Sequence, residues 1–172
     1  MNKRNLIVFD TEVTGLDDNA ELMSFAASII NFKDIENYYV SEVLYTFPVK
    51  QDIKYHPHRF EYMKFENNRL QDNTTKLMMF FEKYKSDIFV GFNPQFDMKF
   101  LKRKCQIPFV KMIDISSLIN YLLLKGKLKP YHRILEIAEQ LNLDVFSYTG
   151  ICNLQADVRL YTDIFLKLTE IL

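Results

Sequence analysis

The feature that most constrains this chain is an apolar run that ends in two acids. Leu6–Phe9 is continuously apolar, and Asp10 and Glu12 follow directly before a turn at Thr14-Gly15. The run predicts a buried central strand, and a spacing of two residues places both carboxylates on one face of that strand. A charge at the end of a buried strand is costly without a partner, and a shared cation is one such partner. A D-x-E pair alone is more often a solvated surface pair.

The rest of the chain predicts an α/β fold in which strands come first and helices cluster later. Leu22–Phe32 and Tyr38–Phe47 are rich in Ile, Val, Phe and Tyr, and we expect them to form an antiparallel meander with the first strand. Ile88–Val90 predicts a short buried strand that ends at Gly91. Helical spacing of apolar residues recurs from Thr74 to about Ser86, from Gln95 towards Pro108, after Pro130, and from Leu154 to Leu168. Gln51–Asn73 has no clear period, and we expect a loop there with at most one short helix.

Composition limits the class of protein more than its function. A chain of 172 residues with 48% hydrophobic content can fill one core, so we expect a single domain over residues 1–172. The 22 basic and 22 acidic residues balance, so any grip on nucleic acid must be local. Cys105 and Cys152 have no CxxC spacing, which argues against a disulfide framework or a zinc site. Without a signal peptide or a run of about 20 apolar residues, we expect a soluble cytoplasmic protein and no membrane contact.

Two further acids lie beside apolar residues. Asp97 falls in the first turn of the helix expected after Gly91-Phe92-Asn93, where a carboxylate also complements the helix dipole. Asp157 projects beside the apolar stripe of the last helix, so we expect it to need a partner. Asp163 has more polar neighbours and is expected to be an ordinary surface acid.

Together, these segments resemble the three motifs of the DEDD 3′-to-5′ exonuclease family, which has an RNase H-like fold. Phe9–Leu16 is similar to the first motif, F-D-x-E-T-T-G-L. Gly91–Leu101 is similar to the second, G-H-N-x-x-F-D-x-x-F-L, and departs from it at Phe92. Ala156-Asp157 resembles the end of the third, H-x-x-x-A-D. The resemblance implies a mixed sheet, with its first three strands antiparallel and further strands parallel, flanked by helices.

The resemblance also implies a site and a reaction. Two Mg²⁺ or Mn²⁺ ions would be held by Asp10, Glu12, Asp97 and Asp157, because carboxylates suit these ions better than zinc. The reaction would be hydrolysis of single-stranded DNA or RNA from the 3′ end to nucleoside monophosphates. Residues that would contact the terminal nucleotide are Thr11, Thr14, Gly15, Leu16, Asn93 and Phe96.

The third motif lacks its usual general base. In the histidine subclass the base lies five residues before the last Asp, which is Cys152 here, and in the tyrosine subclass it lies four before, which is Asn153. A thiol with a pKa of about 8.5 is mostly protonated at neutral pH, so Cys152 would be a weak base. It could be catalytic, or it could be a substituted position in an impaired enzyme. His132 and Tyr148 lie outside the motif register and are expected to be ordinary loop or helix-end residues.

Several alternatives stay open at this stage. The basic stretches Lys99–Lys104 and Lys125–Arg133 could contact phosphates or could be solvated surfaces. The chain could be a regulatory, nucleic-acid-binding module that retains the acidic site without useful turnover. It could also be a proofreading subunit with a polymerase partner. The sequence does not choose between DNA and RNA, and it leaves the oligomeric state open.

Overall fold

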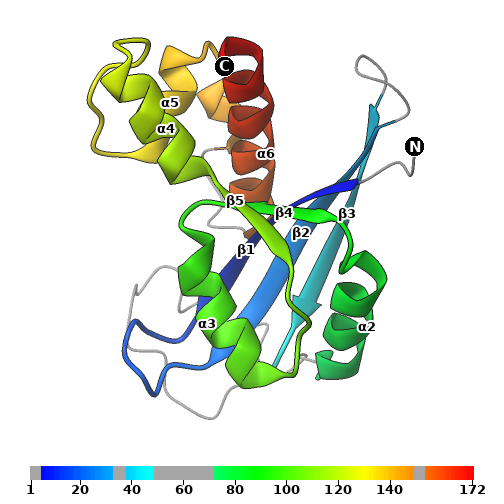
Figure 1. Ribbon diagram of the computed structural model, residues 1–172. Helices are drawn as coiled ribbons and strands as arrows, with labels where there is room; N and C mark the ends of the chain where they lie inside the picture. The colour runs from blue at the N-terminus through cyan, green and yellow to red at the C-terminus, as the bar shows by residue number, and fades with distance from the viewer. Residues whose placement is uncertain (1–4, 33–37, 49–71, 149–153) are drawn as a thin grey trace.

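The structure, a computed structural model, describes residues 5–32, 38–48, 72–148 and 154–172 (Figure 1). Its centre is a five-stranded sheet in the order β3-β2-β1-β4-β5. β1 pairs antiparallel with β2, and β2 pairs antiparallel with β3, whereas β4 lies parallel to both β1 and β5. The predicted mixed sheet, with its antiparallel first three strands, is therefore confirmed. The strand bounds are β1 Asn5–Val13, β2 Leu22–Phe32, β3 Tyr38–Thr46, β4 Ile88–Gly91 and β5 Lys111–Asp114.

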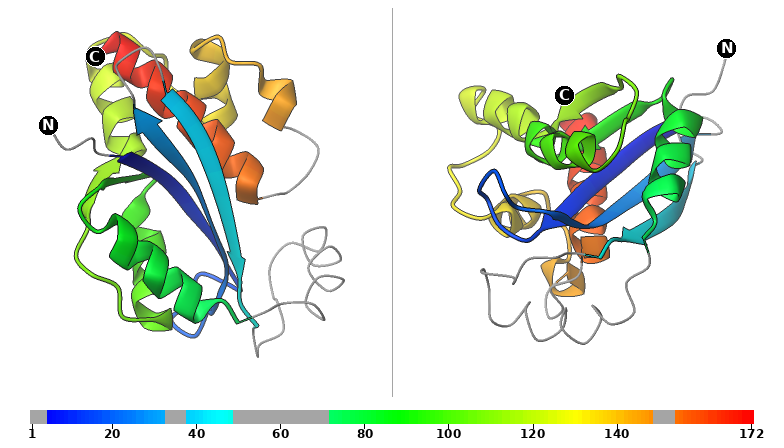
Figure 2. Two further views of the ribbon diagram at one scale, coloured as in Figure 1. Left: turned by 90° about the vertical axis from the view of Figure 1, so that its right-hand side faces the viewer. Right: turned by 90° about the horizontal axis from the view of Figure 1, so that it is seen from below.

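Helices cover both faces of this sheet, as Figures 1 and 2 show. α2 (Thr74–Tyr84) and α3 (Pro94–Lys104) pack on one face, and α4 (Ile115–Leu124), α5 (Ile134–Gln140) and α6 (Leu154–Ile171) pack on the other. A short 3₁₀ helix, η1 (Val145–Tyr148), leads towards α6. None of the described helices is both long and apolar enough to span a membrane.

β1 is buried from both sides, which fixes the strand that carries the first two acids. Ile7 and Phe9 contact the layer of α2 and α3, and Val8 contacts the layer of α4 to α6. The Phe9 ring centroid lies 6.0 Å from that of Phe25 and 5.8 Å from that of Phe89. Because side chains alternate along a strand, Asp10 and Glu12 point to the same side as Val8, towards the layer that contains α6.

The structure differs from the sequence prediction at several boundaries. β1 extends past Asp10 to Val13, with a register shift between Glu12 and Val13. α2 ends at Tyr84 rather than near Ser86. β5 and α4 were not anticipated: β5 has only four residues, and the helical spacing of Ile115, Leu118, Ile119 and Leu122 was the available signal for α4. The expected loop at Gln51–Asn73 lies almost entirely outside the described residues, as does Cys152.

Candidate active site

Near its end, β1 carries Asp10, whose carboxyl group interacts electrostatically with three other acids. Asp10 lies opposite Ala26 of β2, and the register shift that follows Glu12 is a feature that often occurs next to active sites. Burial raises the pKa of Asp10 well above its ordinary value, and the negative charge of Asp97 raises it further. Asp157 and Glu12 add to the same effect, against a hydrogen bond from the backbone of Thr11. Asp10 is therefore close enough to the other three acids to interact with each.

Asp97 is brought to this strand end by α3. Its side chain is only 3% exposed, and the Thr11 hydroxyl donates a hydrogen bond of 2.5 Å to Asp97 Oδ1. Burial raises the pKa of Asp97 to about 6, although hydrogen bonds from Thr11 and Asp10 act in the opposite direction. A hydrogen bond between the Asp10 and Asp97 carboxyl groups requires a proton, so the two titrate as a pair.

The turn from β4 into α3 positions Asp97. At Gly91, a Cβ atom would lie 3.0 Å from Pro94 Cβ and 3.3 Å from the Phe9 carbonyl oxygen, so glycine allows β4 to approach β1 here without crowding. Asn93 adopts a left-handed φ of 54°, which Asn tolerates better than most residues. Its backbone N–H donates a hydrogen bond of 3.0 Å to Asp114 at the end of β5.

Asp114 is a structural acid that sequence reasoning missed. Partial burial opposes its ionisation, but hydrogen bonds from Ser116, Asn93 and Ser117 hold the pKa of its carboxyl below the usual value. It also caps α4 by accepting from the Ser116 backbone N–H. The D-x-S-S sequence before an apolar run was the available signal for this cap.

α6 contributes Asp157 and, one turn later, Tyr161. The Tyr161 ring stacks on Phe92, with centroids 5.8 Å apart and planes at 21°. Burial raises the pKa of the Tyr161 phenol, and the charges of Asp10 and Asp157, followed by those of the two other acids, add to this effect. Sequence reasoning treated Tyr161 only as part of an apolar stripe. Its i, i+4 spacing from Asp157 was the signal that places both on one helix face.

The arrangement suits a hard divalent cation in its donor chemistry. Four carboxylates share one electrostatic field, and within the described chain neither Asp10 nor Asp97 forms an ion pair with a lysine or arginine. Even so, no three Asp, Glu, His or Cys side chains among the described residues form a group that could hold an ion as they stand. The closeness of the four carboxylates does not by itself give coordination geometry. Side-chain rotation would be needed to ligate an ion.

The residues predicted to receive a nucleotide differ in how accessible they are. Leu16 is 72% exposed in the turn after β1, and Asn93 is also exposed. Thr14 and Gly15 are buried, and the Thr14 hydroxyl accepts a 2.9 Å hydrogen bond from the Glu21 backbone N–H. The other two predicted nucleotide contacts are Thr11 and Phe96. The Thr11 hydroxyl donates a hydrogen bond to Asp97, and the centroid of the Phe96 ring lies 5.0 Å from that of the Phe100 ring.

One interpretation from the sequence is wrong. Asp163 is not an ordinary surface acid: it is half-buried and accepts a hydrogen bond from the Tyr148 hydroxyl. η1 folds back on α6 and brings the two together, and burial together with Asp163 raises the pKa of Tyr148 to about 12. Tyr148 thus has a defined partner, whereas His132 contacts Glu136 through its backbone N–H.

Comparison with protein families identifies the type of domain. A family model described as Exonuclease (RNase T type) matches residues 7–147, which is most of the chain. This chain belongs to that exonuclease family. The matched range ends before α6, so the place of Asp157 in the site depends on its electrostatic interaction with Asp10. No curated protein sequence matches the chain.

Solved structures of this exonuclease domain's fold include three nucleases with low sequence identity. Product-bound exonuclease I is 12% identical with a TM-score of 0.71, and the match covers 98% of this chain and 44% of the exonuclease I chain. Cell-death related nuclease 4 is also 12% identical, with a TM-score of 0.74 and coverages of 98% and 64%. The nuclease domain of 3′hExo, a DEDDh family member, is 13% identical with a TM-score of 0.68 and coverages of 98% and 93%. The predicted RNase H-like fold is confirmed, and the chain spans less than half of exonuclease I.

Proposed function

We propose that this exonuclease domain hydrolyses single-stranded nucleic acid from the 3′ end and releases nucleoside monophosphates. The observation that carries the proposal is the buried Asp10–Asp97 pair: burial raises the pKa of both carboxyl groups, and the charges of the other three acids raise the pKa of Asp10 further. A buried group of like charges is stable in its ionised form only beside cations. Mg²⁺ or Mn²⁺ ions held by Asp10, Glu12, Asp97 and Asp157 would supply an activated water and stabilise the leaving 3′ oxygen.

The substrate class is supported by the neighbours. One structure of the E. coli exonuclease I is a complex with a dT13 oligonucleotide, and the 3′hExo nuclease domain was solved with rAMP bound. Both ligands are single-stranded nucleic acid or its monomer. On this chain, the exposed Leu16 in the turn that follows β1 offers an apolar contact for a terminal base. The choice between DNA and RNA is left to experiment.

The chain's own groups divide the remaining work. The Thr11 hydroxyl donates a hydrogen bond to the Asp97 carboxylate, and the left-handed turn at Asn93 begins the helix that carries this acid. The Tyr161 phenol stays protonated, so it can donate a hydrogen bond but is not suited to accept a proton. Cys152 occupies the motif position of the base, and we propose that a largely protonated thiol there makes turnover slow rather than absent.

An end-labelled oligonucleotide assay tests the proposal. DNA and RNA substrates with a free 3′ hydroxyl should be shortened one nucleotide at a time when Mg²⁺ or Mn²⁺ is present, and Asp10→Ala should remove this activity. A 3′ phosphate should suppress it. Cuts within a circular substrate would contradict the 3′-end mechanism. Binding without any turnover would instead favour the regulatory, nucleic-acid-binding module.

A further inference from the structure

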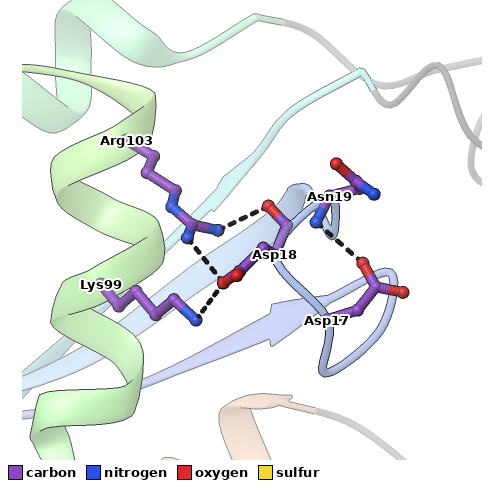
Figure 3. A network of polar contacts seen from close by, with 5 residues as sticks. All are labelled: Asp17, Asp18, Asn19, Lys99 and Arg103. Atoms are coloured by element: carbon purple, nitrogen blue, oxygen red, sulfur yellow. Dashed lines mark hydrogen bonds and ion pairs between the residues drawn. The ribbon is translucent and has the colours of Figure 1, made fainter.

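Two cations of α3 converge on a single acid of the loop between β1 and β2 (Figure 3). Lys99 Nζ lies 2.8 Å from Asp18 Oδ1, and Arg103 Nη2 lies 3.1 Å from the same oxygen. Arg103 Nη1 also donates a hydrogen bond of 2.9 Å to the Asp18 backbone carbonyl oxygen. Because Lys99 and Arg103 are four residues apart on a helix, they lie on one face and can grip one anion together.

This grip is open to solvent. The Asp18 side chain is 84% exposed, and the side chains of Lys99 and Arg103 are 43% and 41% exposed. Exposed ion pairs contribute little to stability, and salt weakens them further. One amino group of the Arg103 guanidinium donates to the Asp18 backbone carbonyl oxygen, so Arg103 does not form a bidentate pair with the Asp18 carboxylate. Both cations contact a single carboxylate oxygen of Asp18, so an anion that presents one oxygen to each cation could displace it.

The position of the two cations is appropriate for a nucleic-acid strand. Arg103 is six residues after Asp97, or about 9 Å along the helix axis, and at 3.6 residues per turn Lys99 and Arg103 lie on a different, more exposed side of α3 from the buried Asp97. A cavity of about 160 Å³ beside it is lined by Arg103, Lys104 and Phe100, together with Glu21 of the loop. The last turn of α3 also carries Lys102. The same loop that carries Asp18 carries the exposed Leu16. The cations are therefore bonded to the same loop that carries the exposed Leu16.

We propose that Lys99 and Arg103 form a subsite for a backbone phosphate of single-stranded nucleic acid, and that Asp18 occupies this subsite until a strand displaces it. The inference depends on the proposed nuclease function. A phosphodiester offers anionic oxygens to the same two cations, and a strand that binds also releases its own condensed counterions, which a carboxylate of the chain cannot do. Asp18 then acts as an internal competitor that lowers affinity, most strongly at low salt.

A different role for Asp18 predicts effects of the opposite sign. Suppose that the contacts of Asp18 with Lys99 and Arg103 only fix the loop so that Leu16 faces the substrate. Removing either the acid or a cation would then loosen the loop. Asp18→Asn and Arg103→Gln would both weaken binding. If the cations bind phosphate, Asp18→Asn frees them and strengthens binding, whereas Arg103→Gln weakens it. The sign of the Asp18 variant therefore separates the two roles.

The test is fluorescence anisotropy of a labelled single-stranded oligonucleotide with the full chain, with Ca²⁺ replacing Mg²⁺, over a range of NaCl concentrations. Asp17→Asn is the matched control, because Asp17 lies in the same loop, loses the same charge and contacts the Asn19 backbone N–H instead of a cation. Circular dichroism checks that each variant is folded.

We expect Asp18→Asn to lower the dissociation constant by about 2- to 5-fold relative to Asp17→Asn at low salt, the range that exposed pairs imply. This gain should shrink as salt rises. Lys99→Gln and Arg103→Gln should each weaken binding and lower the slope of log K against log salt by about 0.7. Equal effects of the two aspartate variants, or weaker binding by Asp18→Asn, would overturn the subsite and leave the nuclease function intact. Absence of both binding and turnover in the unaltered chain would overturn both proposals.

Discussion

Asp10 and Asp18 lie before and after one turn of the chain, and their surroundings are opposite. Asp10 is buried among Glu12, Asp97 and Asp157, and its pKa is raised. Asp18 is exposed and contacts Lys99 and Arg103, which lower its pKa through hydrogen bonds. Two acids only eight residues apart thus have opposite surroundings: Asp18 contacts cations, and Asp10 lies among other acids. An acid with cations of its own is already neutralised, whereas an acid among acids takes up a proton or a cation from outside the chain.

Of the effects predicted here, the difference in turnover between Asp10→Asn and Asp18→Asn should be the largest. Asp10→Asn removes a proposed metal ligand, and we expect turnover of a labelled oligonucleotide to fall by at least about 10²-fold, as for other groups that stabilise a transition state directly. Asp18→Asn should leave turnover equal or higher. If Asp10→Asn retained most of the activity, the carboxylate group would not be the reaction centre.

The stability of the chain should also depend on pH through the buried pair. The folded pKa of Asp97 is raised from 3.8 to about 6, so the folded state holds more protons than the unfolded state between these values. Stability in EDTA should therefore fall as pH rises from about 4 to about 6, by on the order of 2–3 kcal/mol. Urea unfolding at several pH values measures this. Saturating Mg²⁺ should reduce the loss at neutral pH, because an ion that binds only the folded chain stabilises it.

The Asp10→Asn variant provides the control for that experiment. It removes one charge of the coupled pair, so the dependence on pH should become shallower, and the stabilisation by Mg²⁺ should largely disappear. Asp18→Asn should leave both unchanged, because its pKa is lowered by exposed partners and it lies outside the acidic group. Stability that rises through this pH range in EDTA would contradict the raised pKa values.

A smaller effect is expected from Thr11→Val, which removes the hydroxyl that donates to Asp97. A hydrogen bond to a charged group contributes about 1.5–3 kcal/mol, and its loss should raise the pKa of Asp97 further. Because metal ligation requires the ionised carboxylate, the rise of activity with pH should move to higher pH, and more Mg²⁺ should be needed. Rates measured over pH and Mg²⁺ concentration test this. An unchanged pH profile would mean that Thr11 does not influence the ionisation of Asp97.

The difference between the two acids also explains how far the sequence could be used for prediction. Strand alternation placed Asp10 and Glu12 on one face, but Asp10, Glu12, Asp97 and Asp157 were predicted to form one site only because their segments resemble the motifs of the exonuclease family. Asp18, by contrast, gave no signal. Its partners lie more than 80 residues away, and only the packing of α3 against the loop brings them together. The contact of Asp114 with Asn93 was missed for a similar reason, since it depends on β5 lying beside β4, whereas its capping role had a local signal.

Tyr161 gives the smallest and most specific prediction. Tyr161→Phe keeps the ring that stacks on Phe92 and removes only the hydroxyl, so stability should change by less than about 0.5 kcal/mol. Because the phenol is held protonated among acids, it can contribute a donated hydrogen bond but no base, and turnover should fall by no more than about 10-fold. The pH profile should keep its shape. Steady-state rates from pH 5 to 9 measure both quantities. If Tyr161→Phe lowered turnover as much as Asp10→Asn and also removed the change in rate at high pH, Tyr161 would be the general base in place of Cys152.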